Sequence, residues 1–195
     1  MFRQSNQQFR DLRPRACGRR GCVHLSAFTF IEVLAVVLIL GIASAIIVPQ
    51  FTSRDDLDVQ SATRAVMADL LYAQDRAIAT QQYQYVVFNG TGQSYSLYSG
   101  SSTGPTTLLT HPVNLNNYVM TFGQTGSNNI SSDVVLGAVS FNTQNTVAFD
   151  EMGTPYAYNS GTTSQLTQPG TIALNSGSYS LTISVTQDTG EITVN

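Results

Sequence analysis

The chain of 195 residues has nine arginines, no lysine and twelve acidic residues, for a formal net charge of −3. The charge is uneven, because six arginines precede residue 28, whereas residues 50–195 hold three arginines and ten carboxylates, a net charge of −7. Such an acidic region repels polyanions, so nucleic acid is not an expected partner.

Residues 1–27 are polar, rich in arginine and without a regular apolar pattern, which predicts a disordered cytoplasmic leader. Both cysteines, Cys17 and Cys22, lie in this leader. Together with His24 they form only a weak zinc pattern, since a zinc site needs further ligands at regular spacing. No metal and no other cofactor is therefore expected.

An uninterrupted apolar run extends from residue 28 to residue 48. As a helix rising ~1.5 Å per residue, its 21 residues span about 31 Å, close to the roughly 30 Å of a bilayer core. Arginines before the run and aspartates after it predict a transmembrane helix with a cytoplasmic amino end and an exported carboxyl end. Glu32 is the one charge in the run, and its cost in lipid makes it a functional candidate.

Three interpretations of this run compete. A secretory signal fits the small residues 43–45, Ala-Ser-Ala, as a cleavage site. A plain uncleaved anchor fits the length. Neither interpretation explains Glu32, and a signal cut there also leaves the apolar residues 46–48 unexplained. The third interpretation rests on a resemblance to a known family.

The start of the run resembles the amino-terminal signature of type IV pilins and of the pseudopilins of type II secretion systems. Counted from Phe28 as the first residue, Thr29 is second, Glu32 fifth, Gly41 fourteenth and Pro49 twenty-second. All five residue types fall where that family usually has them.

The resemblance implies processing and assembly. In that family a prepilin peptidase removes the leader and methylates the new amino-terminal phenylalanine, which places the cut between Ala27 and Phe28 and the methyl group on Phe28. This chain has Ala27 where the family usually has glycine. The resemblance also implies that Glu32 pairs with the free amino terminus of a neighbouring subunit in a filament, which makes burial of both charges far less costly.

Pro49 is predicted to kink the helix at the membrane surface, because it lacks an amide proton and clashes with the preceding turn. A second helix is predicted to begin near Ser53, with a capping hydroxyl followed by acidic residues, and to end near Thr80. Apolar residues recur there every three or four positions, which predicts an amphipathic helix within residues 49–80 packed on a sheet. The predicted stripe is Val59, Ala62, Val66, Leu70, Ala73 and Ala77, widened by Met67, Leu71 and Ile78, and the polar face carries Arg64, Asp75 and Arg76.

Residues 81–195 contain short runs of β-branched and aromatic residues separated by Gly, Asn and Ser, which predicts strands joined by turns. The predicted strands are residues 82–89, 94–99, 106–110, 118–122, 134–141, 146–150, 171–175, 178–186 and 191–194. Asn89-Gly90 and residues 188–190, Asp-Thr-Gly, predict hairpins. Two polar stretches, residues 124–132 and 159–170, are predicted to be loops.

The head also resembles the GspH/FimT branch of the same family. Residues 73–88 are similar to its junction between helix and first strand, and residues 147–155 and 181–194 are similar to its carboxyl-terminal part. The resemblance implies a pilin-like α+β fold, in which a long amino-terminal helix, transmembrane in its first part and amphipathic in its second, packs on an antiparallel β-sheet head.

Few side chains of the head offer chemistry. His111 is the one histidine after the apolar run and is predicted to be an exposed loop residue, so the parts for nucleophilic catalysis are missing and no enzyme is expected. Asp150 and Glu151 are either calcium ligands or, as we favour without an Asp-x-Asp-x-Asp pattern, turn residues. Four tyrosines of the first hairpin either line a binding face or, as strand aromatics usually do, pack across strands: Tyr83, Tyr85, Tyr95 and Tyr98.

The favoured hypothesis is a minor pseudopilin of a type II secretion system, a single-pass inner-membrane protein with a cytoplasmic amino terminus and a periplasmic head. Its expected partners are other pseudopilins in a hetero-oligomeric filament, the prepilin peptidase, an inner-membrane assembly platform and membrane lipid. The alternative is a minor type IV pilin of the FimT kind, involved in pilus assembly or DNA uptake. The acidic head disfavours DNA binding, which requires a basic patch.

Overall fold

The computed structural model describes residues 28–47, 54–124, 126 and 128–195. The chain forms two compact units, Met1–Val48 and Pro49–Asn195, and each is described by itself. The predicted leader, Ala27, Pro49 and Ser53 lie outside the described residues.

The first unit contains helix α1, Phe30–Ile47, of 18 residues. Its start is a capping arrangement, because the Oγ1 of Thr29 accepts a hydrogen bond of 3.3 Å from the backbone amide of Glu32. The carbonyl of Thr29 accepts further bonds from the amides of Glu32 and Val33 at 3.0 and 3.2 Å. Among the described residues, no helix is both long and apolar enough to cross a membrane.

The second unit begins with helix α2, Asp55–Thr80, of 26 residues. Its amino-terminal cap is Arg54, which makes no side-chain capping bond, so the cap is not the hydroxyl that the sequence predicted. Three aspartates occupy the first turn, where their charges are favourable to the helix dipole. The helix ends at Gln81, whose left-handed φ of 51° turns the chain towards the first strand.

One face of α2 is buried, and it is the predicted stripe with the addition of Thr63. The buried residues are Val59, Ala62, Thr63, Val66, Leu70, Ala73 and Ala77. Two residues predicted to widen the stripe differ, because Leu71 and Ile78 are 44% and 45% exposed. Each follows a stripe residue directly and is therefore turned about 100° away from it. Arg76 was predicted on the polar face but is half-buried, with a hydrogen bond of 3.5 Å from its guanidinium to the hydroxyl of Tyr72.

The remainder of the second unit forms two sheets. The larger sheet contains β1 (Tyr83–Asn89), β2 (Ser94–Ser101), β3 (Gly104–Leu108), β4 (Val119–Phe122), β5 (Asn129–Ser131), β7 (Thr146–Phe149), β8 (Pro155–Asn159) and β9 (Thr162–Gln165). Its order is β5-β4-β2-β1-β7-β8-β9, with β3 also paired to β2. The smaller sheet contains β6 (Val135–Ser140), β10 (Gly170–Ser176), β11 (Tyr179–Val185) and β12 (Ile192–Val194), in the order β12-β11-β10-β6. Within the described residues the strand pairs are antiparallel except β4 with β5.

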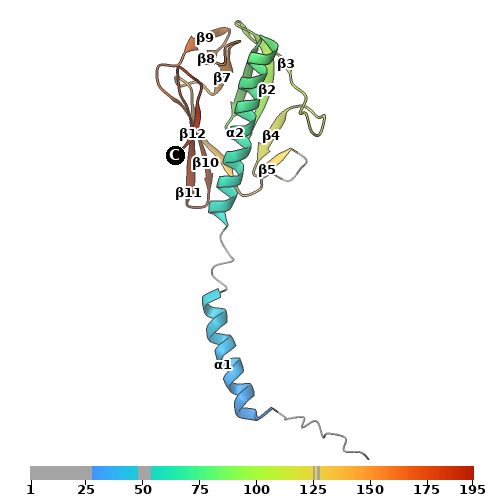
Figure 1. Ribbon diagram of the computed structural model, residues 1–195, viewed down its shortest axis with the longest axis vertical. Helices are drawn as coiled ribbons and strands as arrows, with labels where there is room; N and C mark the ends of the chain where they lie inside the picture. Colours follow the sequence, from blue (N-terminus) through green and yellow to red (C-terminus); the bar gives the residue numbers. More distant parts are fainter. Residues whose placement is uncertain (1–27, 48–53, 125, 127) are drawn as a thin grey trace, which may run out of the picture. The chain divides into compact units, whose positions relative to one another are not determined.

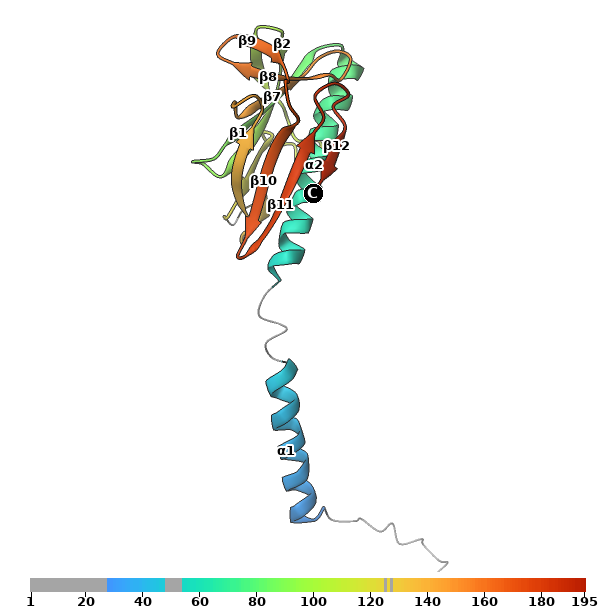
Figure 2. The same cartoon turned by 90° about the vertical axis from the view of Figure 1, so that its left-hand side faces the viewer.

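Helix α2 packs where the two sheets approach each other. Figure 1 shows it between β10, β11 and β12 on one side and β2, β4 and β5 on the other, and Figure 2 shows the smaller sheet beside it. The helix contacts β1, β5 and β7 of the larger sheet and β10, β11 and β12 of the smaller one. A single core results, to which Leu70, Val86, Phe149, Ile172 and Ile183 contribute fully buried side chains. The predicted α+β class is confirmed, with two sheets in the head instead of one.

The predicted hairpins are confirmed. Strands β1 and β2 pair antiparallel across the Asn89-Gly90 turn, in which the side chain of Asn89 accepts a bond of 2.9 Å from the amide of Gly92. Strands β11 and β12 pair around Gly190, whose φ of 67° is one that glycine adopts easily.

The two predicted loops are wrong in part, because each contains a short strand. Residues 124–132 include β5 and residues 159–170 include β9. Both strands lie at the ends of the larger sheet, where one side has no neighbour and polar residues are favoured, so their composition resembles that of a loop. Strand β8 was not predicted either, and it begins with Pro155, a residue that sheets tolerate at the first position of a strand.

Two adjacent leucines of α2 provide a direct test of this packing. Leu70 is fully buried and Leu71 is 44% exposed. We expect Leu70→Ala to lower the free energy of unfolding by about 2–5 kcal/mol, because it leaves a cavity in the core. Leu71→Ala should change it by no more than about 0.5 kcal/mol. Urea unfolding of the full chain in detergent, followed by tyrosine fluorescence, measures both, and equal effects would contradict the packing of α2.

Candidate functional site

Helix α1 presents apolar side chains on all its sides. From Phe28 to Ile42 every side chain is exposed, and the large apolar ones have exposed fractions between 48% and 83%. These side chains are Phe28, Phe30, Ile31, Val33, Leu34, Val36, Val37, Leu38, Ile39, Leu40 and Ile42. A helix that is apolar all round is stable only inside lipid or among other apolar helices. Within its own unit, α1 therefore leaves a continuous apolar surface uncovered.

Glu32 is the one charged side chain between residues 28 and 47. It lies in the first turn of α1, where a negative charge is favourable to the helix dipole. A shallow groove of about 260 Å³ is lined by Glu32 and Phe28 together with Val33, Val36 and Val37. The structure thus places two of the predicted site residues beside one groove: Phe28, which precedes α1, and Glu32 in its first turn.

Thr29 has a role that the sequence prediction did not assign to it. Its side chain caps α1 by accepting from the amide of Glu32, so the two residues form the first half of a capping box. The pattern Thr-x-x-Glu before an apolar run was the available signal. The predicted sites at Ala27 and Pro49 lie outside the described residues.

The four tyrosines of the first hairpin lie on both faces of the larger sheet. Tyr95 faces the core, with its ring 5.5 Å from that of Phe88 and 5.8 Å from that of Phe122. Tyr85 faces away from α2 and is buried against Tyr158, with ring centroids 5.2 Å apart. The packing interpretation is confirmed for these two residues.

The hydroxyl of Tyr85 donates a hydrogen bond to the carbonyl of Ser101. Burial raises the pKa of Tyr85 to about 12, with a further contribution from the nearby Tyr158. Tyr83 and Tyr98 lie on the same face as Tyr85 and are half-buried. Tyr83 also lines a cavity, which is described below.

Asp69 of α2 is the centre of a polar cluster that the sequence did not predict. Its carboxylate accepts hydrogen bonds from the hydroxyls of Tyr95, at 2.6 Å, and Tyr118, at 3.0 Å. Burial raises the pKa of Asp69 above its ordinary value, against the lowering effects of the two hydroxyls and of His111. The cluster joins α2 to β2 and to the residue that precedes β4.

His111 lies in a loop, as predicted, but it is half-buried and not exposed. Its ring packs on that of Tyr118, with centroids 4.6 Å apart, and its Nδ1 accepts a bond of 3.2 Å from the amide of Val113. Packing on Tyr118 removes it from solvent, which sequence distance alone could not indicate.

The turn interpretation of Asp150 is confirmed. Its Oδ1 accepts from the amides of Met152 and Thr154 at 2.9 and 2.8 Å, and its carbonyl accepts from Gly153. These bonds are typical of a turn in which aspartate satisfies the backbone. Within the described part of the chain, no three histidine, cysteine or acidic side chains are grouped to hold a metal.

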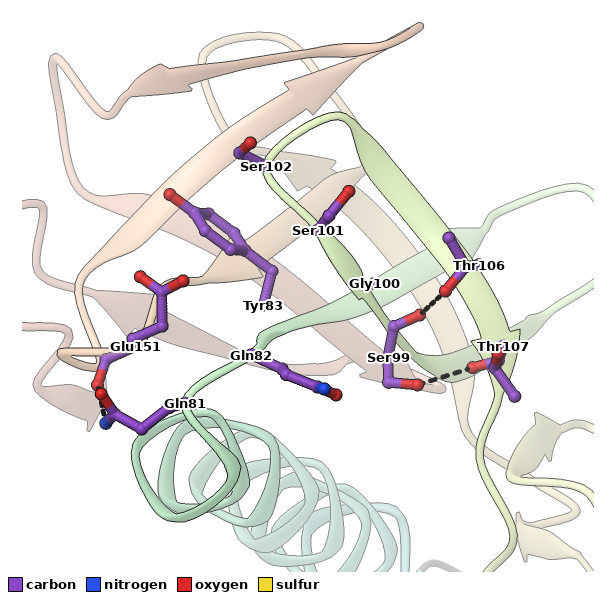
Figure 3. A pocket seen from close by; sticks show the side chains of 10 residues that line it. All are labelled: Gln81, Gln82, Tyr83, Ser99, Gly100, Ser101, Ser102, Thr106, Thr107 and Glu151. Atoms are coloured by element: carbon purple, nitrogen blue, oxygen red, sulfur yellow. Dashed lines mark hydrogen bonds between the residues drawn. The ribbon is translucent and has the colours of Figure 1, made fainter.

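A polar cavity of about 570 Å³ lies beside this turn (Figure 3). Gln81 and Gln82 contribute from the end of α2, Tyr83 from β1 and Glu151 from the β7–β8 turn, and the opposite wall comes from β2 and β3. The surrounding side chains are mostly uncharged hydrogen-bonding groups. These groups can donate hydrogen bonds to a polar ligand and accept hydrogen bonds from it.

The chain is similar to several known proteins. The sequence model of the family described as type II transport protein GspH matches residues 62–189, about two thirds of the chain. The minor pseudopilin EpsH from the type 2 secretion system of Vibrio cholerae is similar, with 10% identity, a TM-score of 0.48, and coverage of 71% of this chain and 96% of that chain. The type IV minor pilin FimU of Pseudomonas aeruginosa PAO1 is similar in two crystal forms. The first has 15% identity and a TM-score of 0.45, and the match covers 72% of this chain and 90% of that chain. The second has 16% identity and a TM-score of 0.43, and the match covers 70% of this chain and 91% of that chain. The comparison with curated protein sequences found no match.

The raised pKa of Asp69 predicts a pH dependence of stability. The folded state binds this proton more tightly than the unfolded state, so the contribution of Asp69 to stability is complete below the unfolded pKa of about 3.9 and is lost as pH rises through the folded pKa. Asp69→Asn should not lose stability in this way, because an asparagine amide does not titrate. We expect the melting temperature of the variant to rise relative to that of the unchanged protein as pH increases from about 3.5 to 6.

Asp75→Asn is the matched control, because Asp75 is an exposed aspartate of the same helix. Its melting temperature should differ from that of the unchanged protein by a similar amount at every pH. A difference for Asp69→Asn that stays constant across the pH range would show that its carboxylate does not titrate as described.

Proposed function

The chain belongs to the GspH family of type II transport proteins, and from this premise we propose that it is a minor pseudopilin, a structural subunit of the periplasmic pseudopilus of a type II secretion system. The observation that carries the proposal is Glu32, a single carboxylate in the first turn of a helix that is otherwise apolar and exposed on all sides. The family match covers residues 62–189 and does not include α1, so the two lines of support are independent.

The proposed assembly contact follows from the cost of burying charge. When apolar helices associate, Glu32 leaves water and needs a positive partner, because an unpaired buried carboxylate costs several kcal/mol. The described part of α1 contains no basic side chain. The proposed partner is the free amino terminus of Phe28 in a neighbouring subunit, and Phe28 lines the same groove as Glu32. Pairing then neutralises one charge from each subunit.

That partner exists only after processing. We propose that the prepilin peptidase cuts between Ala27 and Phe28, removes the leader and methylates the new amino group. Methylation keeps the positive charge that Glu32 requires. Residues 28–48, three residues more than α1, are the proposed membrane segment before assembly and filament core afterwards.

The proposed topology places the amino terminus in the cytoplasm and residues 49–195 in the periplasm, with Pro49 bending the chain at the membrane surface. Other pseudopilins, the prepilin peptidase, the inner-membrane assembly platform and membrane lipid are the proposed partners. The net charge of −7 of residues 50–195 favours this role over DNA uptake by a type IV pilus.

Processing predicts a defined amino terminus. Protein extracted from membranes should begin at Phe28 and carry one methyl group on its amino nitrogen, as measured by intact mass and amino-terminal sequencing. A chain beginning at Ile46 would instead indicate an ordinary secretory signal and would overturn the proposal.

Glu32→Gln tests the pairing role while retaining the size of the side chain. Because removal of one partner of a buried ion pair costs about 3–5 kcal/mol, and about 1.4 kcal/mol is tenfold, we expect incorporation into filaments to fall by roughly 100-fold or more. Membrane insertion should remain intact. Sheared filament fractions and membrane fractions, probed by immunoblot, measure the two quantities.

Thr29→Val is the matched control, because it removes the side-chain cap of α1 and leaves Glu32 charged. It should retain filament incorporation close to that of the unchanged protein. If both variants lose incorporation to the same extent, Glu32 acts through the helix start and not through an ion pair.

A further inference from the structure

One wall of the polar cavity is formed by the closely paired backbones of β2 and β3. The pairing of β2 with β3 shifts register between Ser99 and Gly100, and a side chain at Gly100 would come within 2.2 Å of the carbonyl oxygen of Gly104. Only glycine allows the two strands to approach so closely. The Tyr85 hydroxyl of β1 donates a hydrogen bond to the carbonyl of Ser101 at the end of β2. This bond ties the wall that β2 and β3 form to the neighbouring strand β1.

The side chains around the cavity keep unused hydrogen-bonding capacity. In Figure 3 the hydrogen bonds between the lining residues involve Ser99 with Thr106 and Thr107, and the amide of Gln81 with the carbonyl of Glu151. None of them uses the side chains of Gln82, Tyr83 or Glu151; in Figure 3 Tyr83 lies beside Glu151, and Gln82 points toward Ser99. Amides and hydroxyls in this arrangement can both donate to and accept from one ligand.

Tyr83 supplies a rigid aromatic surface. Its ring lies 6.4 Å from that of Tyr85, in a stacked arrangement, and 6.5 Å from that of Tyr156. A half-buried tyrosine ring has few rotatable bonds, so packing a ligand on it costs little conformational entropy.

The residues that line the cavity favour a neutral polar ligand over an apolar or an anionic one. An apolar ligand would leave the polar groups without partners, which is costly. An anionic ligand is repelled by Glu151 and by the net charge of −7 of residues 50–195. A sugar fits, because its ring has a face of C–H groups that packs on an aromatic ring and an edge of hydroxyls that bond to amides and carboxylates. The volume of 570 Å³ lies within the range of about 300–1,000 Å³ that small-ligand sites occupy.

We propose that this cavity is a binding site for a neutral glycan, with a sugar ring against Tyr83 and its hydroxyls bonded to Gln82 and Glu151. The site is separate from α1 and does not depend on the proposed assembly role. It gives the head a ligand-binding function in addition to its place in the fold.

Saturation-transfer difference NMR on the full chain tests the proposal with three neutral probes: maltotriose, cellotriose and triacetylchitotriose. The protein is kept in lauryldimethylamine oxide, a detergent without a sugar headgroup. We expect transfer to at least one trisaccharide and an affinity that falls about tenfold or more in Tyr83→Ala. Tyr83→Phe, which keeps the ring, should retain binding. Tyr179→Ala is the control, since Tyr179 is a 51% exposed tyrosine of β11 outside the cavity.

Glu151→Gln separates a neutral ligand from a cationic one. Glycan binding should persist in this variant within a few fold, because the amide still bonds to hydroxyls. If Tyr83→Ala does not fold, as judged by its melting temperature, Gln82→Ala replaces it, since Gln82 is exposed. The proposal is overturned if none of the three sugars shows transfer, or if Tyr83→Ala, or Gln82→Ala in its place, binds as well as Tyr179→Ala. It is also overturned if the cavity binds a lysine-rich peptide instead, in a manner that Glu151→Gln abolishes.

Discussion

The burial of one face of α2 against two sheets is the interaction on which the head depends. Neither sheet covers its apolar face alone, and the helix contacts both. Alanines at positions 62, 73 and 77 are fully buried and allow the helix backbone to approach the strands closely, whereas Leu70 and Val66 fill the space between them. The polar bonds of Asp69 to Tyr95 and Tyr118 add direction to this contact, since they fix the rotation of the helix over the sheet.

Apolar side chains are buried in the head but exposed on α1. The head covers its apolar surface with its own elements, whereas the large apolar side chains between Phe28 and Ile42 are exposed within their own unit. In the proposed function, Glu32 needs a neighbour that brings a positive charge, because an unpaired buried carboxylate costs several kcal/mol.

The polar cavity has a different origin from the assembly site. Its residues come from the end of α2, from β1, from the β2–β3 pair and from the β7–β8 turn, so no short motif marks it. The sequence predicts Tyr83 as an aromatic residue of a strand and Glu151 as a residue of a turn. Only the fold places them around the same opening, as Figure 3 shows.

The sequence by itself determined the features that depend on local periodicity: the apolar run with Glu32, the stripe of α2 and the hairpins. Each follows from residues within a few positions of one another. The tertiary structure decided which strands join which sheet, that β5 and β9 pair at sheet edges despite their polar composition, and that Leu71 faces solvent while Leu70 is buried. It also decided the contacts of Asp69, His111 and the cavity. These contacts join residues that are far apart in the chain. The packing of α2 on both sheets brings them together, so no local sequence pattern predicts them.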